Sequence, residues 1–279
     1  MNKINKHLSI CADDFGLGKN INKSITELID KKIITETSCI ILNINKFLND
    51  FNELKKRKRN VDIGVHIFFT KKNQDIDTCY INYRKTFNNY FIKSHLNLIN
   101  KNELELLINS QLDKFENFFN FPPLFIDSHM HIHQFPCISD IFIKIIKKRY
   151  YNNKIYPWVR NSQNLLETKS LKKVLLNYYG TKFKKKLIQE KIFTNHNFEG
   201  IYDYNKKLNI KKYYKSILKN LVLRNGTLFM VHPGSNFYLA DNYDEIYDYR
   251  INEFKFLQSN FFKKLLTKYN IKLGKLNKY

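Results

Sequence analysis

Residues 121–136 read Phe-Pro-Pro-Leu-Phe-Ile-Asp-Ser-His-Met-His-Ile-His-Gln-Phe-Pro, an apolar run followed by an acid and three histidines at alternate positions. Alternate residues of an extended strand lie on one face, so this spacing predicts that four polar side chains share a face: Asp127, His129, His131 and His133. Imidazole is a common metal ligand and titrates near neutrality. A single such histidine would be an ordinary hydrogen-bonding residue, but the group favours a metal or proton-transfer site with further ligands elsewhere in the chain.

The rest of the chain alternates apolar strand patterns with helical periodicity. Expected strands cover 8–12, 35–42, 61–69, the run before Asp127, 155–160, 227–231 and 271–276, and expected helices cover 20–32, 46–58, 103–119, 138–148, 171–179, 182–191, 210–223 and 243–269. Such alternation implies parallel strands with helices outside, so we expect a (β/α) barrel of seven or eight units, complete or incomplete. No composition break divides the 279 residues, which predicts a single catalytic domain over 1–279. We interpret 70–100 as an insertion or lid and 194–204 as a loop.

Composition bounds the class of protein. Hydrophobic residues make up 43%, enough for a large core, and the net charge of +23 would normally suggest nucleic acid. The lysines are spread over the whole chain, however, and Lys, Asn, Ile, Phe and Tyr are all abundant, as A/T-rich codons would produce. We therefore expect no specific nucleic-acid partner, only adhesion at low salt.

The sequence carries no signal of export or membrane insertion. Mean hydropathy is −0.48, no apolar run approaches the ~20 residues needed to cross a bilayer, and the start has no signal-peptide core. We expect a soluble, cytoplasmic protein without a membrane span, and the sequence leaves a homodimer open. The four cysteines have no Cys-x-x-Cys spacing and are expected to be reduced thiols: Cys11, Cys39, Cys79 and Cys137.

Acids and histidines fall repeatedly at the carboxyl ends of the expected strands. Chemistry in (β/α) barrels takes place at that rim, and histidines of a packed core would have no reason to gather there. The residues at or near the ends of five different strands are Asp13, Asp14, His66, His129, Arg160 and His232.

These residue types suit a hydrolytic metal centre. One carboxylate and two imidazoles leave positions open on the ion, a second carboxylate can take a proton from water, and a separate histidine can protonate a departing amine. Arg160 can orient the base or hold a developing oxyanion. Asp127 and His131 are candidates for fixing the tautomer of His129. In a regular strand Asp13 and Asp14 point in opposite directions, so only one of them should reach the metal.

The chain resembles the YdjC/ChbG-type carbohydrate deacetylases. The blocks that carry the resemblance occur in the same order over residues 8 to about 260: Asp13-Asp14-Phe15-Gly16, Ile34-Thr35-x-Thr37-Ser38, Gly64-x-His66-x-x-x-Thr70, Asp127-Ser128-His129-x-His131-x-His133-x-Phe135-Pro136 and His232-Pro233-Gly234. The resemblance implies a deformed (β/α) TIM-like barrel and a divalent-metal amidohydrolase that removes acetyl groups from N-acetylated sugars. By position it implies the metal ligands Asp14, His66 and His129, with Asp13 as general base and His232 as general acid.

The resemblance has departures, and other functions stay open. Ile-Phe-Phe follows His66 where many members have Asn, and 70–100 matches no substrate loop, which affects the substrate more than the metal site. Mixed nitrogen and oxygen ligands suit zinc, while the resemblance also implies magnesium. The main expectation is a chitooligosaccharide-like substrate and release of acetate. The alternatives are another metal-dependent barrel hydrolase such as a phosphoesterase using His-x-His, a basic nucleic-acid-binding protein, and an inactive family member.

Overall fold

The computed structural model describes residues 6–69, 83–151, 156–164, 171–201, 209–220, 226–235 and 246–276. Its strands are β1 (Lys6–Phe15), β2 (Glu36–Cys39), β3 (Asp62–Ile67), β4 (Phe125–Ser128), β5 (Trp158–Val159), β6 (Asn197–Glu199), β7 (Thr227–Val231) and β8 (Ile271–Leu273). Its helices are α1 (Lys19–Asp30), α2 (Leu48–Lys56), α4 (Tyr83–His95), α5 (Lys101–Phe119), α6 (Ile138–Tyr150), α7 (Leu171–Gln189), α8 (Ile210–Asn220), α9 (Tyr247–Gln258) and α10 (Asn260–Lys268). Two short 3-10 segments follow strands, η1 (Ile41–Asn43) and η2 (His129–Gln134).

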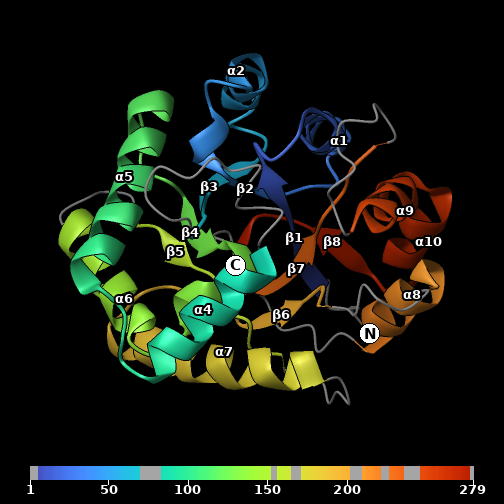
Figure 1. Ribbon diagram of the computed structural model, residues 1–279. Helices are drawn as coiled ribbons and strands as arrows, with labels where there is room; N and C mark the ends of the chain where they lie inside the picture. The colour runs from blue at the N-terminus through green and yellow to red at the C-terminus, as the bar shows by residue number, and fades with distance from the viewer. Residues whose placement is uncertain are drawn as a thin grey trace.

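The strands form one parallel sheet that curls into a deformed barrel surrounded by helices (Figure 1). Hydrogen bonds connect them in the order β5-β4-β3-β2-β1-β7-β6, and β8 pairs with the first residues of β1. Between β5 and β6 the pairing is irregular. A bridge joins Val159 to Thr194, and hydrogen bonds connect Asn161 with Asn195 and the Phe198 N–H with the Gln163 carbonyl. The predicted α/β barrel is therefore confirmed, with its irregular seam between β5 and β6.

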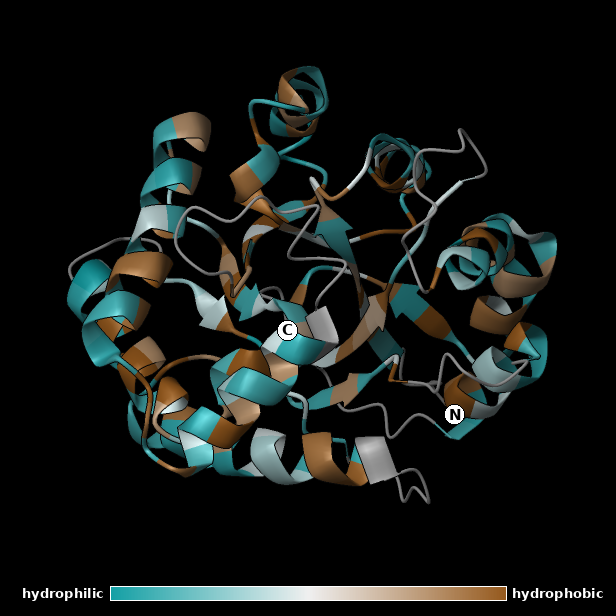
Figure 2. Cartoon of the chain, in the orientation of Figure 1, coloured by the Kyte–Doolittle hydropathy of each residue, from teal (hydrophilic) through white to brown (hydrophobic). Residues whose placement is uncertain are grey.

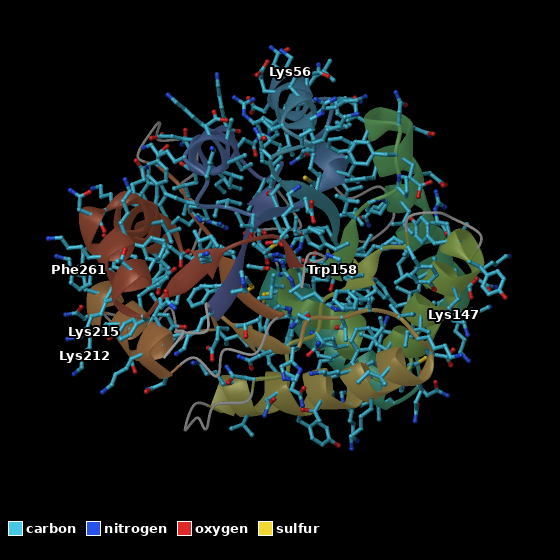
Figure 3. All side chains as sticks on the ribbon, turned by 180° about the vertical axis from the view of Figure 1, so that it is seen from behind. Lys56, Lys147, Trp158, Lys212, Lys215 and Phe261 are labelled. Atoms are coloured by element: carbon cyan, nitrogen blue, oxygen red, sulfur yellow. The ribbon has the colours of Figure 1, made fainter. Side chains whose placement is uncertain are left out.

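Aromatic side chains fill the barrel interior. The Phe125 and Trp158 rings stack with their centroids 4.5 Å apart, and Trp158 lies near the middle of the molecule (Figure 3). Gly64 makes room for them, because a Cβ at that position would lie 2.6 Å from the Phe125 ring. This aromatic packing fills the interior between the two ends of the barrel.

The helices pack apolar faces against the outside of the sheet. On α1, Ile21, Ile25 and Leu28 are buried at the helical spacing that the sequence shows. Hydrophilic and hydrophobic residues both occur along α5, α6 and α9 (Figure 2). Lysine side chains extend outward from several helices, as at Lys56 and Lys147 (Figure 3). Within the described ranges, no helix combines the length and apolarity that crossing a bilayer would require.

Several expected boundaries were wrong. The two helices expected at 171–179 and 182–191 form one helix, α7, which ends at Gln189. Gly180 does not end the helix but allows close packing, since a Cβ there would lie 2.5 Å from the backbone nitrogen of Gln163. The expected loop at 194–204 contains β6, and the expected helix at 243–269 is interrupted at Ser259, whose side chain caps α10. Residues 83–95 of the proposed insertion form α4, while 70–82 lie outside the described residues.

The described cysteines agree with the expectation of reduced thiols. Cys11 and Cys39 are buried and Cys137 is partly exposed, and all three are free. Cys79 lies outside the described residues.

Candidate active site

The end of β1 brings two adjacent acids to the mouth of the barrel. Asp14 has a φ of 71°, in the left-handed region, and the pairing of β1 with β2 shifts register between Ala12 and Phe15. The premise that Asp13 and Asp14 belong to a regular strand was therefore wrong. The irregular backbone buries both carboxylates at the same end of the barrel, where they contact different partners.

Asp14, His66 and His129 come together as the sequence predicted, and one potential ligand atom from each lies within 4.8 Å of the other two. Asp14 Oδ1 is 3.6 Å from His66 Nε2 and 3.4 Å from His129 Nδ1. This buried oxygen accepts no hydrogen bond from the described part of the chain. Burial alone would raise the pKa of Asp14, but Arg250 and His129 hold it well below its usual value. An anionic oxygen beside two imidazole nitrogens is a donor set that fits a divalent ion.

Asp127 fixes the orientation of His66. Its Oδ1 lies 2.7 Å from His66 Nδ1, and the Ser38 hydroxyl contacts both groups. A carboxylate only accepts, so Nδ1–H donates, and in the neutral ring the Nε2 lone pair faces Asp14. Burial would lower the pKa of His66, yet Asp127 raises it above its ordinary value. Asp127 had been a candidate partner of His129; its contact is with His66.

Arg160 lies beneath this site and connects two carboxylates. Its guanidinium holds Asp13 through both oxygens, at 2.6 and 2.7 Å, and reaches Asp127 Oδ2 at 2.7 Å. Arg160 is fully buried. Burial alone would raise the pKa of Asp127, but Arg160, His66 and the Ser38 hydroxyl together hold it low. Cys11, Asp13 and Asp127 also lie close together, but the cation between them is Arg160. Of its two expected roles, this geometry favours orientation of Asp13 over contact with an oxyanion.

The four alternate residues Asp127 to His133 do not share one face, so that interpretation was wrong. β4 ends at Ser128, and Met130 and His131 both have φ near 57°, which turns the chain into η2. His133 instead contacts the Ser128 hydroxyl at 2.7 Å and the Arg160 carbonyl at 2.9 Å. Burial lowers the pKa of His133 to about 4, so its neutral ring joins β4 to β5. His131 is buried against Phe198 and stays neutral for the same reason.

His232 follows β7 at the same end of the barrel. Burial lowers the pKa of its imidazole to about 4, against the opposing pull of Asp14 and Asp13. Its backbone N–H donates to Glu253 Oε2 at 2.5 Å.

Some residues that contact the site were not among the predicted catalytic or metal residues. Arg250 Nη2 lies 2.7 Å from Asp14 Oδ2, Glu253 holds the backbone of His232, and Ser38 contacts His66. Ser38 belongs to the quoted block Ile34-Thr35-x-Thr37-Ser38, and that block could have identified it as a site residue. Arg250 and Glu253 lie in the helix expected at 243–269, and nothing in its periodicity marks them.

The fold and the site define a deformed α/β barrel with a candidate metal centre at the carboxyl ends of its strands. The sequence model of the YdjC-like protein family matches residues 7–268, so the chain belongs to that family.

The chain is also similar to proteins named as deacetylases and to a solved structure. The chain is 27% identical over 161 residues to a carbohydrate deacetylase of Brevibacillus brevis, covering 56% of this chain and 61% of that protein. It is 25% identical over 168 residues to a chitooligosaccharide deacetylase of Escherichia fergusonii, covering 56% and 66%. The matches thus span less than two thirds of these relatives. A crystal structure from Enterococcus faecalis V583, for which cellobiose-phosphate cleavage has been suggested, superposes with a TM-score of 0.68 at 18% identity over 98% of both chains, which supports the fold.

Proposed function

We propose that the protein is a metal-dependent carbohydrate deacetylase that acts through one catalytic domain. It hydrolyses the N-acetyl group of an N-acetylated sugar, of chitooligosaccharide type, and releases acetate and an amino sugar. The observation that carries this proposal is the convergence of Asp14, His66 and His129 on one point at the barrel mouth. The names of the similar deacetylases support the substrate class.

Asp14, His66 and His129 would hold the divalent ion. The donor set suits zinc, cobalt, nickel or manganese, and the resemblance to carbohydrate deacetylases also implies magnesium. A bound ion would polarise the acetamide carbonyl and acidify a water molecule.

Asp13 and His232 would move the protons. Arg160 holds Asp13 in a fixed orientation, from which its carboxylate accepts a proton from the attacking water. The low pKa makes His232 neutral at rest, so its proton has to arrive during the reaction. His232 would then give this proton to the leaving nitrogen, so the products are acetate and a free amine.

Replacement of either histidine ligand tests the proposal. His66→Ala and His129→Ala should each lose bound metal and release of acetate from N-acetylated chitooligosaccharides, measured by elemental analysis and an acetate assay. His95→Ala is the matched control, because His95 lies on α4 and contacts Tyr179. Full activity in either ligand variant would refute the assignment.

The structure removes the observation that favoured a phosphoesterase. That alternative depended on His129-x-His131 acting as a pair, but His131 is turned by its left-handed backbone and packs on Phe198. Release of acetate, with no phosphate released from phosphorylated sugars, is the product pattern that we expect.

A further inference from the structure

Arg250 divides the two oxygens of Asp14 between two different tasks. Arg250 Nη2 lies 2.7 Å from Asp14 Oδ2, while Asp14 Oδ1 faces His66 and His129. Both members of this ion pair are almost completely buried, with side chains 2% and 1% exposed. A guanidinium stays charged under all ordinary conditions, so this contact persists in the folded protein.

Helix α9 is fixed against the site by a second set of contacts. The Gly234 N–H donates to the Arg250 carbonyl at 3.2 Å, and a Cβ on Gly234 would lie only 3.0 Å from Arg250 Cβ. One turn further, Glu253 accepts from the His232 N–H and from the Tyr214 hydroxyl, each at 2.5 Å. The same helix therefore holds both Asp14 and the segment that carries His232, and Arg250 has little freedom to move away.

We propose that Arg250 is a positioning residue that restricts Asp14 to one oxygen toward the metal ion. A carboxylate with both oxygens free can bind a cation through both, and the second oxygen then takes a position that water or substrate would use. By occupying Oδ2, Arg250 keeps that position open. This inference rests on the metal site of the proposed function. It adds that Arg250 determines which positions on the metal ion stay open for water or substrate.

The test counts water molecules on bound Mn²⁺. In Arg250→Met, Asp14 gains a free second oxygen, so Mn²⁺ should bind at least as tightly as in the wild-type protein, by calorimetry. Water-oxygen NMR relaxation should show one fewer exchangeable water on the ion. Acetate release should fall about 10- to 100-fold in kcat/KM, the usual range for partners of metal ligands.

Two variants separate positioning from general stability. Arg149→Met removes an arginine that pairs with Glu116 and Asp113 away from the site, and it should keep the wild-type water count. Arg250→Lys keeps a positive donor for Asp14 Oδ2 and should restore that count. If Arg250→Met does not fold, Arg250→Gln replaces it with the same expectations, because its amide is too short to reach Asp14.

The outcomes are distinguishable. A wild-type water count in a folded Arg250→Met variant, or loss of Mn²⁺ binding in it, would overturn the role of Arg250. Absence of Mn²⁺ binding by the wild-type protein would overturn the metal site and this inference together. Binding with the expected water counts but without acetate release would overturn the proposed function and leave the role of Arg250 standing.

Discussion

At the scale of single residues, the backbone of Asp14 shows why its role was hard to assign. A φ of 71° is uncommon for a residue other than glycine, and such conformations cost of order 1–3 kcal/mol. The surrounding ion pair with Arg250 and the buried turn at Gly16 hold it in place. The sequence contains both acids but no sign that the backbone becomes irregular at Asp14, so alternation gave the wrong geometry.

Asp127→Asn should weaken metal binding about 10- to 100-fold. Arg160 requires an acceptor at the Oδ2 position, so the new amide group would face His66 Nδ1. That nitrogen would then have to accept, the proton would move to Nε2, and Nε2 would lose the lone pair that faces Asp14. Calorimetric titration with Zn²⁺ measures the loss.

Ser38→Ala is the control for this prediction. It removes a hydroxyl that contacts both His66 and Asp127 but leaves their direct contact intact, so the loss of affinity should be much smaller. Zn²⁺ binding by Asp127→Asn that equals the wild-type affinity would show that Asp127 does not set the tautomer of His66.

At the scale of elements, one side chain of α5, Gln111, holds the backbone that follows β3 beside the site. The Gln111 amide accepts from the Phe68 N–H at 2.9 Å and donates to the Phe68 carbonyl at 3.0 Å. The Phe68 ring in turn lies against His129, with centroids 4.9 Å apart. Gln111 thus replaces a neighbouring strand at the point where β3 has ended, and it supports one wall of the candidate metal site.

Gln111→Leu should lower the free energy of unfolding by roughly 2–4 kcal/mol. The substitution leaves a buried N–H and a buried carbonyl without partners, and each such group costs about 1–3 kcal/mol. Urea unfolding followed by circular dichroism measures the change. Gln258→Leu, on the partly exposed end of α9, is the control and should change stability by less than about 0.5 kcal/mol. Equal effects of the two substitutions would contradict a special role for Gln111.

Element types were more predictable than their ends. Long periodic helices such as α5 were predicted nearly to their bounds, because the apolar residues that such a helix buries recur at helical spacing in the sequence. The turn at Met130 and His131 was not, since neither residue type signals a left-handed conformation. β6 was not predicted because three residues are too few to show a strand pattern, and its pairing comes from β7. Arg250 was not predicted as a site residue because the charge pattern of a helix does not reveal which of its charged side chains is buried.

At the scale of the whole molecule, the two ends of the barrel have different ionisable groups. The end opposite the candidate site contains Glu36, which is fully buried. Its Oε1 accepts from the Leu276 N–H at 2.7 Å, and the Thr35 hydroxyl donates to its other oxygen. Asp62 lies nearby and pairs with Lys275 at 2.7 Å. Burial raises the pKa of Glu36 from 4.5 to about 8, so a carboxyl group joins the last described segment to the base of the barrel.

Glu36 should make stability fall as pH rises. The folded protein keeps this proton up to about pH 8, whereas the unfolded chain releases it near 4.5. The stability that comes from holding the neutral acid is therefore fully present below pH 4.5, declines between these values, and is lost above pH 8. Glu36→Gln cannot ionise and its carbonyl can still accept from Leu276, so it should melt near the wild-type temperature at pH 4.5 and above it beyond pH 8.

Thermal melting of the two proteins across this pH range checks the prediction. The control is Glu53→Gln, because Glu53 lies at the surface beside Lys56 and Arg57 and its removal should not reproduce the gain at high pH. A melting-temperature difference between Glu36→Gln and wild type that stays constant from pH 4.5 to pH 8 would mean that Glu36 ionises alike in the folded and unfolded chains. The base of the barrel would then have to stabilise the carboxylate of Glu36, through water or through the charge of Lys275, enough to cancel the effect of burial on its pKa.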